Sequence, residues 1–307
     1  MESSIKKVHT VICPVCGSRG IDPFLSCKDY LTTQEVFEIN KCNACDFAFT
    51  QDFPVENEIG KYYEAPEYIS HSDTNRGIIN SLYHLARKIA LKSKSKLVTK
   101  YAGSKKGMLL DIGSGTGYFL NRMKELKWIV TGIEKSASAR KYAKQKFGID
   151  CQDSEYLYEI PCQTKDVITM WHVLEHLEHL NSVLDYLQKI LKDDGTLVIA
   201  LPNKESFDAR YYKEYWAAYD VPRHLWHFSS SDFQRIANRH QFEIIEIKPM
   251  YFDAFYISML SEKNMGHSFA SLRGLIRGGV YFLRTLRNKN GSSSLIYILK
   301  KKITNTK

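Results

Sequence analysis

The sequence has no run of about 18 consecutive apolar residues, the length that a membrane-spanning helix requires. Its first ten residues, MESSIKKVHT, lack the apolar stretch of a secretory signal. No internal repeat and no low-complexity tract is evident either. These absences lead us to expect a cytoplasmic globular protein without a transmembrane segment.

The chain has 307 residues, which suits a core domain of about 200 residues and a smaller unit. Four of the seven cysteines form two close pairs, which favours a metal site in a reducing compartment over disulfides. The net charge of +9 is compatible with nucleic acid, an anionic membrane or an acidic substrate, and it selects none of them.

Changes in composition divide the chain into three predicted segments. Residues 1–53 are rich in cysteine and predict short strands around a metal. Residues 54–105 are rich in tyrosine and then show helical periodicity, which predicts a linker or lid. Residues 106–307 alternate apolar strand patterns with helical patterns, apart from a helical insertion at about 253–290. This alternation predicts an α/β domain with a mostly parallel sheet.

A glycine-rich loop follows the first strand of the third segment. The apolar stretch at 109–112 runs into Gly113-Ser114-Gly115-Thr116-Gly117, and glycine is needed where a chain turns sharply and a ligand approaches the backbone. The next strand ends in Glu134, a carboxylate that can accept both hydroxyls of a ribose. The spacing G-x-G-x-G differs from the G-x-G-x-x-G of dinucleotide-binding folds.

This loop and its acidic partner resemble motif I and the acidic residue of class I S-adenosylmethionine-dependent methyltransferases. The stretch DVITMWHVLEHL at 166–177 resembles the fourth strand of that family and the segment after it, and LKDDGTL at 191–197 resembles the turn before its fifth strand. The resemblance covers roughly residues 107–250. It implies a Rossmann-like, seven-stranded sheet and S-adenosylmethionine as cofactor. The residues that it places at the cofactor are Asp111, Gly113, Ser114, Gly115, Gly117, Glu134, Asp153, Trp171 and His172.

Two C-x-x-C pairs, Cys13/Cys16 and Cys42/Cys45, predict a structural zinc site. Two residues between thiolates form a tight turn that directs both sulfurs at one metal, and two such turns complete a tetrahedral Cys₄ site. Redox thiols are the competing interpretation. Cys27 lies between the pairs and could replace one ligand, although a buried free thiol is the simpler interpretation.

An aromatic segment at 211–229 contains the candidate catalytic histidines. It resembles the D-x-P-x-H-x-x-x-F-S element that follows the fifth strand in many zinc-ribbon-bearing or quinol-methylase-like methyltransferases. Histidine suits proton removal from a hydroxyl acceptor at neutral pH. We therefore predict His224, and next His227, as the general base. Contact with substrate or cofactor, and a purely structural role, are the alternatives.

Residues 268–290 combine apolar and basic residues in a helical pattern, with an expected break at Gly278-Gly279. Such a helix can contact an anionic membrane or can form a lid on its own domain.

For the whole protein we predict methyl transfer to a small-molecule, glycan or lipid-linked acceptor, with a hydroxyl as the acceptor group. The alternative is an RNA methyltransferase that uses the zinc ribbon and the basic linker, because a zinc module with positive charge suits nucleic acid. Against that alternative, the fourth strand is not followed by D/N-P-P-Y, and no RNA-binding fold is recognisable. A binding protein that has lost its chemistry is a third interpretation, which the intact glycine loop and Glu134 disfavour.

Overall fold

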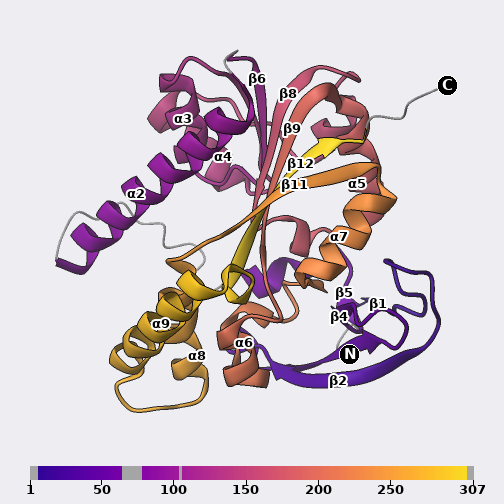
Figure 1. The fold of residues 1–307 in the computed structure, drawn as a ribbon, viewed down its shortest axis with the longest axis vertical. Coiled ribbons are helices and arrows are strands. Elements are labelled where there is room, and N and C mark those ends of the chain that lie inside the picture. Colours follow the sequence, from indigo (N-terminus) through magenta and orange to yellow (C-terminus); the bar gives the residue numbers. More distant parts are fainter. Residues whose placement is uncertain (1–5, 64–77, 104–105, 303–307) are drawn as a thin grey trace.

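The computed structural model describes residues 6–63, 78–103 and 106–302, with the backbone alone for 78–86. Part of the predicted linker, residues 64–77, therefore lies outside the described residues. Within these limits the chain forms a central sheet, helices on both of its sides, and an N-terminal unit of short strands at one end (Figure 1).

The central sheet has six strands in the order β11-β12-β9-β8-β6-β7. Its members are β6 (Met108–Ile112), β7 (Ile129–Ile133), β8 (Lys165–Trp171), β9 (Leu191–Pro202), β11 (Phe242–Pro249) and β12 (Ser294–Lys301). The first four run parallel, whereas β12 is antiparallel to β9 and to β11. The expected α/β class is confirmed. Among the described residues one of the seven strands that the resemblance implies is missing, since residues 149–153 form only a single parallel bridge between Ile133 and Gln152. Just beyond this bridge the Asp153 carboxylate accepts a hydrogen bond from the Tyr156 amide.

Helices α2, α3 and α4 lie on one side of this sheet, and α5 and α7 lie on the other (Figure 1). Their bounds are α2 (Ile78–Tyr101), α3 (Tyr118–Glu125), α4 (Ala137–Phe147), α5 (Leu180–Ile190), α6 (Phe207–Tyr212) and α7 (Ser230–Arg239). Serine caps begin three of them, since Ser136 accepts from the Ala139 amide, Ser206 accepts from the Ala209 amide, and Ser229 forms a capping box with Asp232. The helix expected from 174 begins only at Leu180.

Short 3-10 turns connect several of these elements. They are η1 (Ile59–Tyr63), η2 (Glu155–Glu159), η3 (Leu174–His176), η4 (Lys213–Tyr215), η5 (Ala217–Tyr219) and η6 (Lys289–Gly291). Turn η3 occupies the stretch that the sequence pattern assigned to the start of α5. It places Glu175 and His176 directly beyond the end of β8.

The N-terminal unit is not separate from the core domain. Its strands are β1 (Lys7–Val8), β2 (Ile21–Lys28), β3 (Val36–Cys42), β4 (Ala48–Thr50) and β5 (Phe53–Pro54). Strands β2, β3 and β4 form a sheet whose fourth strand, β10 (Trp226–His227), comes from the aromatic segment after β9. The predicted zinc unit and the predicted catalytic segment therefore share one sheet.

A buried arginine strengthens this connection. The Arg223 side chain is 1% exposed, and its Nη2 lies 2.9 Å from Asp29 of the N-terminal unit and 2.6 Å from Asp220. Its Nη1 also donates to the Tyr62 carbonyl oxygen at 2.9 Å. Removing one partner of such a buried ion pair leaves an uncompensated charge, which costs about 3–5 kcal/mol. Arg223 thus fixes the aromatic segment against the N-terminal unit.

The C-terminal insertion forms two helices, α8 (Asp253–Asn264) and α9 (Ala270–Arg287), which lie against each other (Figure 1). The expected break at Gly278-Gly279 is wrong, because α9 is continuous through both residues. A Cβ atom on Gly274 would lie 2.3 Å from the Met259 Cα atom, and one on Gly278 would lie 2.6 Å from the Phe255 Cα atom. The glycines therefore allow close approach of α8 rather than interrupting α9.

The outer side of α9 exposes apolar residues, among them Leu272, Ile276 and Leu283. Within the described ranges, no helix combines the length and apolar character needed to cross a bilayer. Whether residues 268–290 contact a membrane surface stays a prediction.

Candidate functional site

The carboxyl ends of β6, β7 and β8 meet at one edge of the sheet. Strand pairing places Asp111 opposite Gly132 on one side and opposite Thr169 on the other. Glu134 follows the end of β7, and Trp171 ends β8. In open α/β sheets ligands bind outside this edge. The structure therefore brings together the loop and strand-end residues that the sequence analysis selected.

The glycine loop has the conformation that its composition predicts. Gly113, Gly115 and Gly117 have φ values of 69°, 53° and 81°, in the left-handed region that favours glycine. A Cβ atom on Gly113 would lie 2.3 Å from Val173, and one on Gly117 would lie 2.8 Å from Ala143. A Cβ atom on Gly115 would meet no described atom within 4 Å. Gly115 thus lies beside open space at the sheet edge.

Glu134 is held by the loop that it faces. Its Oε2 accepts from the Gly115 amide at 2.7 Å, and its Oε1 accepts from the Ser136 amide at 2.8 Å. A carboxylate has about four lone-pair positions. Two backbone bonds orient the group and leave capacity for two hydroxyl donors of a ligand.

Asp111 is 2% exposed and accepts a hydrogen bond from the Thr169 hydroxyl at 2.5 Å. Burial raises the pKa of this carboxyl to about 7, against the opposing effects of Thr169 and Lys94. A ligand ammonium group would offset the free-energy cost of burying the ionised carboxylate. Asp111 is thus suited to a cationic ligand group.

Lys94 is a site residue that the sequence analysis missed. It lies on α2, and its Nζ atom is 4.4 Å from the ring centroid of Trp171. Burial lowers the pKa of Lys94, while Asp253 and Asp111 act in the opposite direction. Its only sequence signal is membership of a basic helix, which does not distinguish it from its neighbours. Lys94 can be distinguished from its basic neighbours only in the tertiary structure, by where α2 crosses the edge of the sheet.

His172 lies between two carboxylates. It has a φ of 59°, and its Nδ1 is 3.4 Å from Glu175 and its Nε2 3.4 Å from Asp253. Burial alone would lower the pKa of His172, but the two carboxylates outweigh it and raise the pKa to about 9. Asp153, the remaining predicted cofactor residue, lies at the turn beyond the bridge at Gln152.

The two histidines of the aromatic segment differ in their surroundings. The Nε2 atom of His227 lies 3.0 Å from the Thr50 hydroxyl, inside the sheet that the two units share. Burial, and then the neighbouring His224, lower the pKa of His227 well below its usual range. The Nδ1 atom of His224 lies 2.9 Å from the Ala218 carbonyl oxygen. Because a carbonyl only accepts, Nδ1 carries the proton and Nε2 presents a lone pair.

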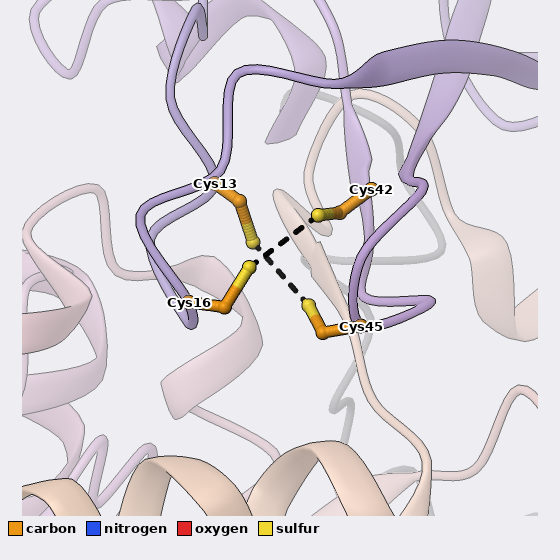
Figure 2. Close-up of side chains that lie close together, drawn as sticks. All are labelled: Cys13, Cys16, Cys42 and Cys45. Carbon is orange, nitrogen blue, oxygen red and sulfur yellow. Dashed lines mark hydrogen bonds between the residues drawn. The ribbon is translucent and has the colours of Figure 1, made fainter.

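The four predicted metal ligands converge on one point (Figure 2). The sulfur atoms of Cys13 and Cys45 are 3.6 Å apart, and those of Cys16 and Cys42 are 3.5 Å apart. A tetrahedral zinc site with Zn–S bonds of about 2.3 Å has sulfur–sulfur separations of about 3.8 Å. The donor set therefore fits zinc in geometry and in chemistry. Cys27, the alternative ligand, is buried in β2 and is not part of this cluster.

Comparison with known protein families agrees with the geometry of the glycine loop and Glu134. The model of a family described as a methyltransferase domain matches residues 83–247, which is more than half of the chain. The chain belongs to the methyltransferase-domain family. The match includes the glycine loop, Glu134 and the aromatic segment with both histidines, so the predicted family is confirmed.

Two curated proteins are each similar to part of the chain. An uncharacterised methyltransferase of Alkaliphilus oremlandii is 33% identical over 36% of the chain and 50% of its own length. A ubiquinone biosynthesis O-methyltransferase of Glaesserella parasuis is 34% identical over 31% of the chain and 45% of its own length. The chain thus spans about half of the length of the curated relatives that it matches. A solved S-adenosylmethionine-dependent methyltransferase from Archaeoglobus fulgidus covers 70% of the chain and 94% of its own chain at 22% identity, with a TM-score of 0.50, which shows a similar fold.

Proposed function

We propose that this methyltransferase transfers the methyl group of S-adenosylmethionine to a hydroxyl of a small-molecule, glycan or lipid-linked acceptor. The observation that carries the proposal is a pair of groups that follow the carboxyl ends of the strands. One is the glycine loop with Glu134, after β6 and β7. The other is His224, which presents an Nε2 lone pair and whose ring centroid lies 4.5 Å from that of His176, beyond β8.

The polar groups of the cofactor each find a complementary residue. Glu134 accepts the two ribose hydroxyls, and Asp111 binds the ammonium group. Lys94 binds the carboxylate of the methionine part, because it is the cation that α2 brings to the same edge. Trp171 and His172 form the wall next to the methyl group, and Asp153 contacts the adenine amine.

The ribose assignment predicts the effect of Glu134→Ala. Loss of the charged hydrogen bonds should weaken S-adenosylmethionine binding by about 1–3 kcal/mol, measured by calorimetry. Glu125→Ala is the matched control, since Glu125 is an exposed carboxylate that pairs with Arg122 on α3. Equal affinities of the Glu134 variant and the wild type would refute the assignment.

A hydroxyl acceptor is supported by the chemistry of His224 and by one relative. The Nε2 lone pair of His224 is suited to the proton of a hydroxyl. The printed name of the Glaesserella parasuis relative describes an O-methyltransferase. We propose the same acceptor chemistry for this chain, with the acceptor hydroxyl activated at His224.

A methyl-transfer assay separates this proposal from the RNA alternative. Cell-extract fractions are incubated with the protein and S-adenosylmethionine labelled in its methyl group. We expect label in a small or glycan-containing fraction, with no loss after nuclease treatment and a shallow dependence on salt. Label that nuclease removes, with binding that falls steeply as salt rises, would establish RNA as the acceptor instead, because counterion release makes nucleic-acid binding salt-dependent.

We further propose that Cys13, Cys16, Cys42 and Cys45 hold a structural zinc ion. Four thiolates leave no open position on the metal, so its contribution is to the folding of the N-terminal unit. Such a unit is too small to be stabilised by apolar burial alone.

A further inference from the structure

A second group of potential metal ligands lies beside the aromatic segment. Glu175, His176 and His224 each offer one ligand atom, and these atoms lie within 4.8 Å of one another. Glu175 and His176 come from turn η3 after β8, and His224 comes from the segment after β9. The rings of His176 and His224 are nearly perpendicular, with centroids 4.5 Å apart.

Each imidazole has one ring nitrogen with a backbone partner, and this decides which nitrogen can bind a metal. The Nδ1 atom of His176 lies 3.0 Å from the Arg223 carbonyl oxygen, and that of His224 lies 2.9 Å from the Ala218 carbonyl oxygen. Carbonyl oxygens only accept, so both Nδ1 atoms carry the proton, and the Tyr63 hydroxyl, 3.1 Å from His176 Nδ1, then accepts from it as well. Both Nε2 atoms keep a lone pair, and that of His224 lies 3.9 Å from Asp220. Backbone partners of this kind hold metal-binding histidines in one tautomer. Among the described residues, none donates a hydrogen bond to either Nε2 atom.

The carboxylate of Glu175 lacks a hydrogen-bond donor as well. Its side chain is fully buried, and neither of its oxygens has a hydrogen-bond partner among the described residues. The contact with His172 Nδ1 at 3.4 Å is an ion pair without hydrogen-bond geometry. An unsatisfied buried carboxylate is costly. Apart from the ring of His172, which lies 3.4 Å from Glu175 Oε1, no described residue offers a donor to the cluster, and a metal ion would complete it.

The surrounding charge favours a cation. Acidic side chains lie around the cluster. Asp220 Oδ2 lies 3.9 Å from the Nε2 atom of His224, and Asp253 Oδ2 lies 3.4 Å from His172, which in turn contacts Glu175.

We propose that Glu175, His176 and His224 bind a divalent transition-metal ion through one carboxylate oxygen and the two Nε2 atoms. For atoms no more than 4.8 Å apart, a central ion lies at most about 2.8 Å from each. Bonds to zinc are about 2.0–2.2 Å long, so small side-chain rotations complete the site. Two nitrogens and one oxygen suit zinc, iron(II), cobalt(II) or nickel(II).

Three protein ligands leave a coordination position open, as in catalytic metal sites. In this methyltransferase the open position would take the oxygen of the acceptor hydroxyl. His224 would then serve the reaction as a ligand of the metal ion, in place of acting as a free base, because its Nε2 lone pair cannot do both. That consequence rests on the proposed function, whereas metal binding itself is measured without cofactor or acceptor. Failure of one is therefore distinguishable from failure of the other.

The experiment is a metal count on the full chain. The protein is loaded with zinc, freed of excess metal by gel filtration and analysed for its elements. We expect two zinc ions per chain, one in the cysteine cluster and one here. Glu175→Gln and the double variant His176→Gln/His224→Gln should each retain one, with affinity at the second site reduced at least about 100-fold.

Two controls make the count decisive. His240→Gln should retain both ions, because both ring nitrogens of His240 already have partners in Asp185 and Asn181. Cobalt(II) loading gives a second measurement, in which the absorption of the nitrogen–oxygen site should vanish in Glu175→Gln while sulfur-to-cobalt charge transfer persists. One zinc per wild-type chain, unchanged in Glu175→Gln, would overturn the proposal and leave acceptor hydroxyls as the donors that fill the cluster.

Discussion

Replacing His224 by alanine is expected to lower kcat by about 10²–10⁴-fold, whether its Nε2 atom removes the substrate proton or holds the metal ion that binds the hydroxyl. His224 presents an Nε2 lone pair, since its Nδ1 proton is bound to the Ala218 carbonyl oxygen. The affinity for S-adenosylmethionine should change little, because Asp111 and Glu134 lie on other elements. Steady-state kinetics and calorimetry on the same preparation measure both quantities.

Two other histidine variants serve as references for His224→Ala. His240→Ala removes a buried imidazole that has no proposed role in the reaction, so this variant should retain the wild-type activity. His227→Ala should lower the melting temperature and should change kcat little, because the Nε2 atom of His227 lies within hydrogen-bond distance of the Thr50 hydroxyl. If His224→Ala raises KM while kcat stays near the wild-type value, His224 only positions the acceptor. A kcat near the wild-type value with unchanged KM would exclude it from the reaction.

Replacing Cys42 by serine is expected to remove one zinc ion per chain and to abolish most of the methyl transfer. In small zinc units the metal supplies about 10 kcal/mol or more of folding free energy. The effect should reach the acceptor site, because Thr50 of the N-terminal unit donates its hydroxyl proton to the His224 carbonyl oxygen at 2.7 Å. The Thr50 amide also donates to the Leu225 carbonyl oxygen at 2.9 Å.

Cys27→Ser is the matched control for this variant. Cys27 is a buried thiol of the same unit, on β2 and outside the metal cluster, so its replacement should leave the zinc count unchanged. Elemental analysis and the methyl-transfer assay are run on both variants. A Cys42→Ser protein that keeps all of its zinc would refute the Cys₄ site. One that loses zinc but keeps full activity would show that the N-terminal unit does not support the acceptor segment.

The sequence alone determined the family, the α/β class, the glycine loop with Glu134 and the four cysteines. These features share a physical reason, because each depends on neighbouring residues and on backbone conformation. Positive φ values select glycine at 113, 115 and 117, and a C-x-x-C turn directs two sulfurs at one point wherever it occurs. The nearness of Asp111 to Glu134 follows from the adjacency of two parallel strands.

Only the tertiary structure decided how the three predicted segments fit together. Strand β10 joins the sheet of the N-terminal unit, and Arg223 pairs with Asp29, 194 residues away in the chain. Lys94 lies at the carboxyl edge of the central sheet because of the position of α2. Gly274 and Gly278 allow α9 to approach α8, whereas the sequence pattern predicted a break in the helix at Gly278-Gly279. Each of these outcomes depends on a contact between distant segments, and the residue pattern at either end of such a contact does not specify its partner.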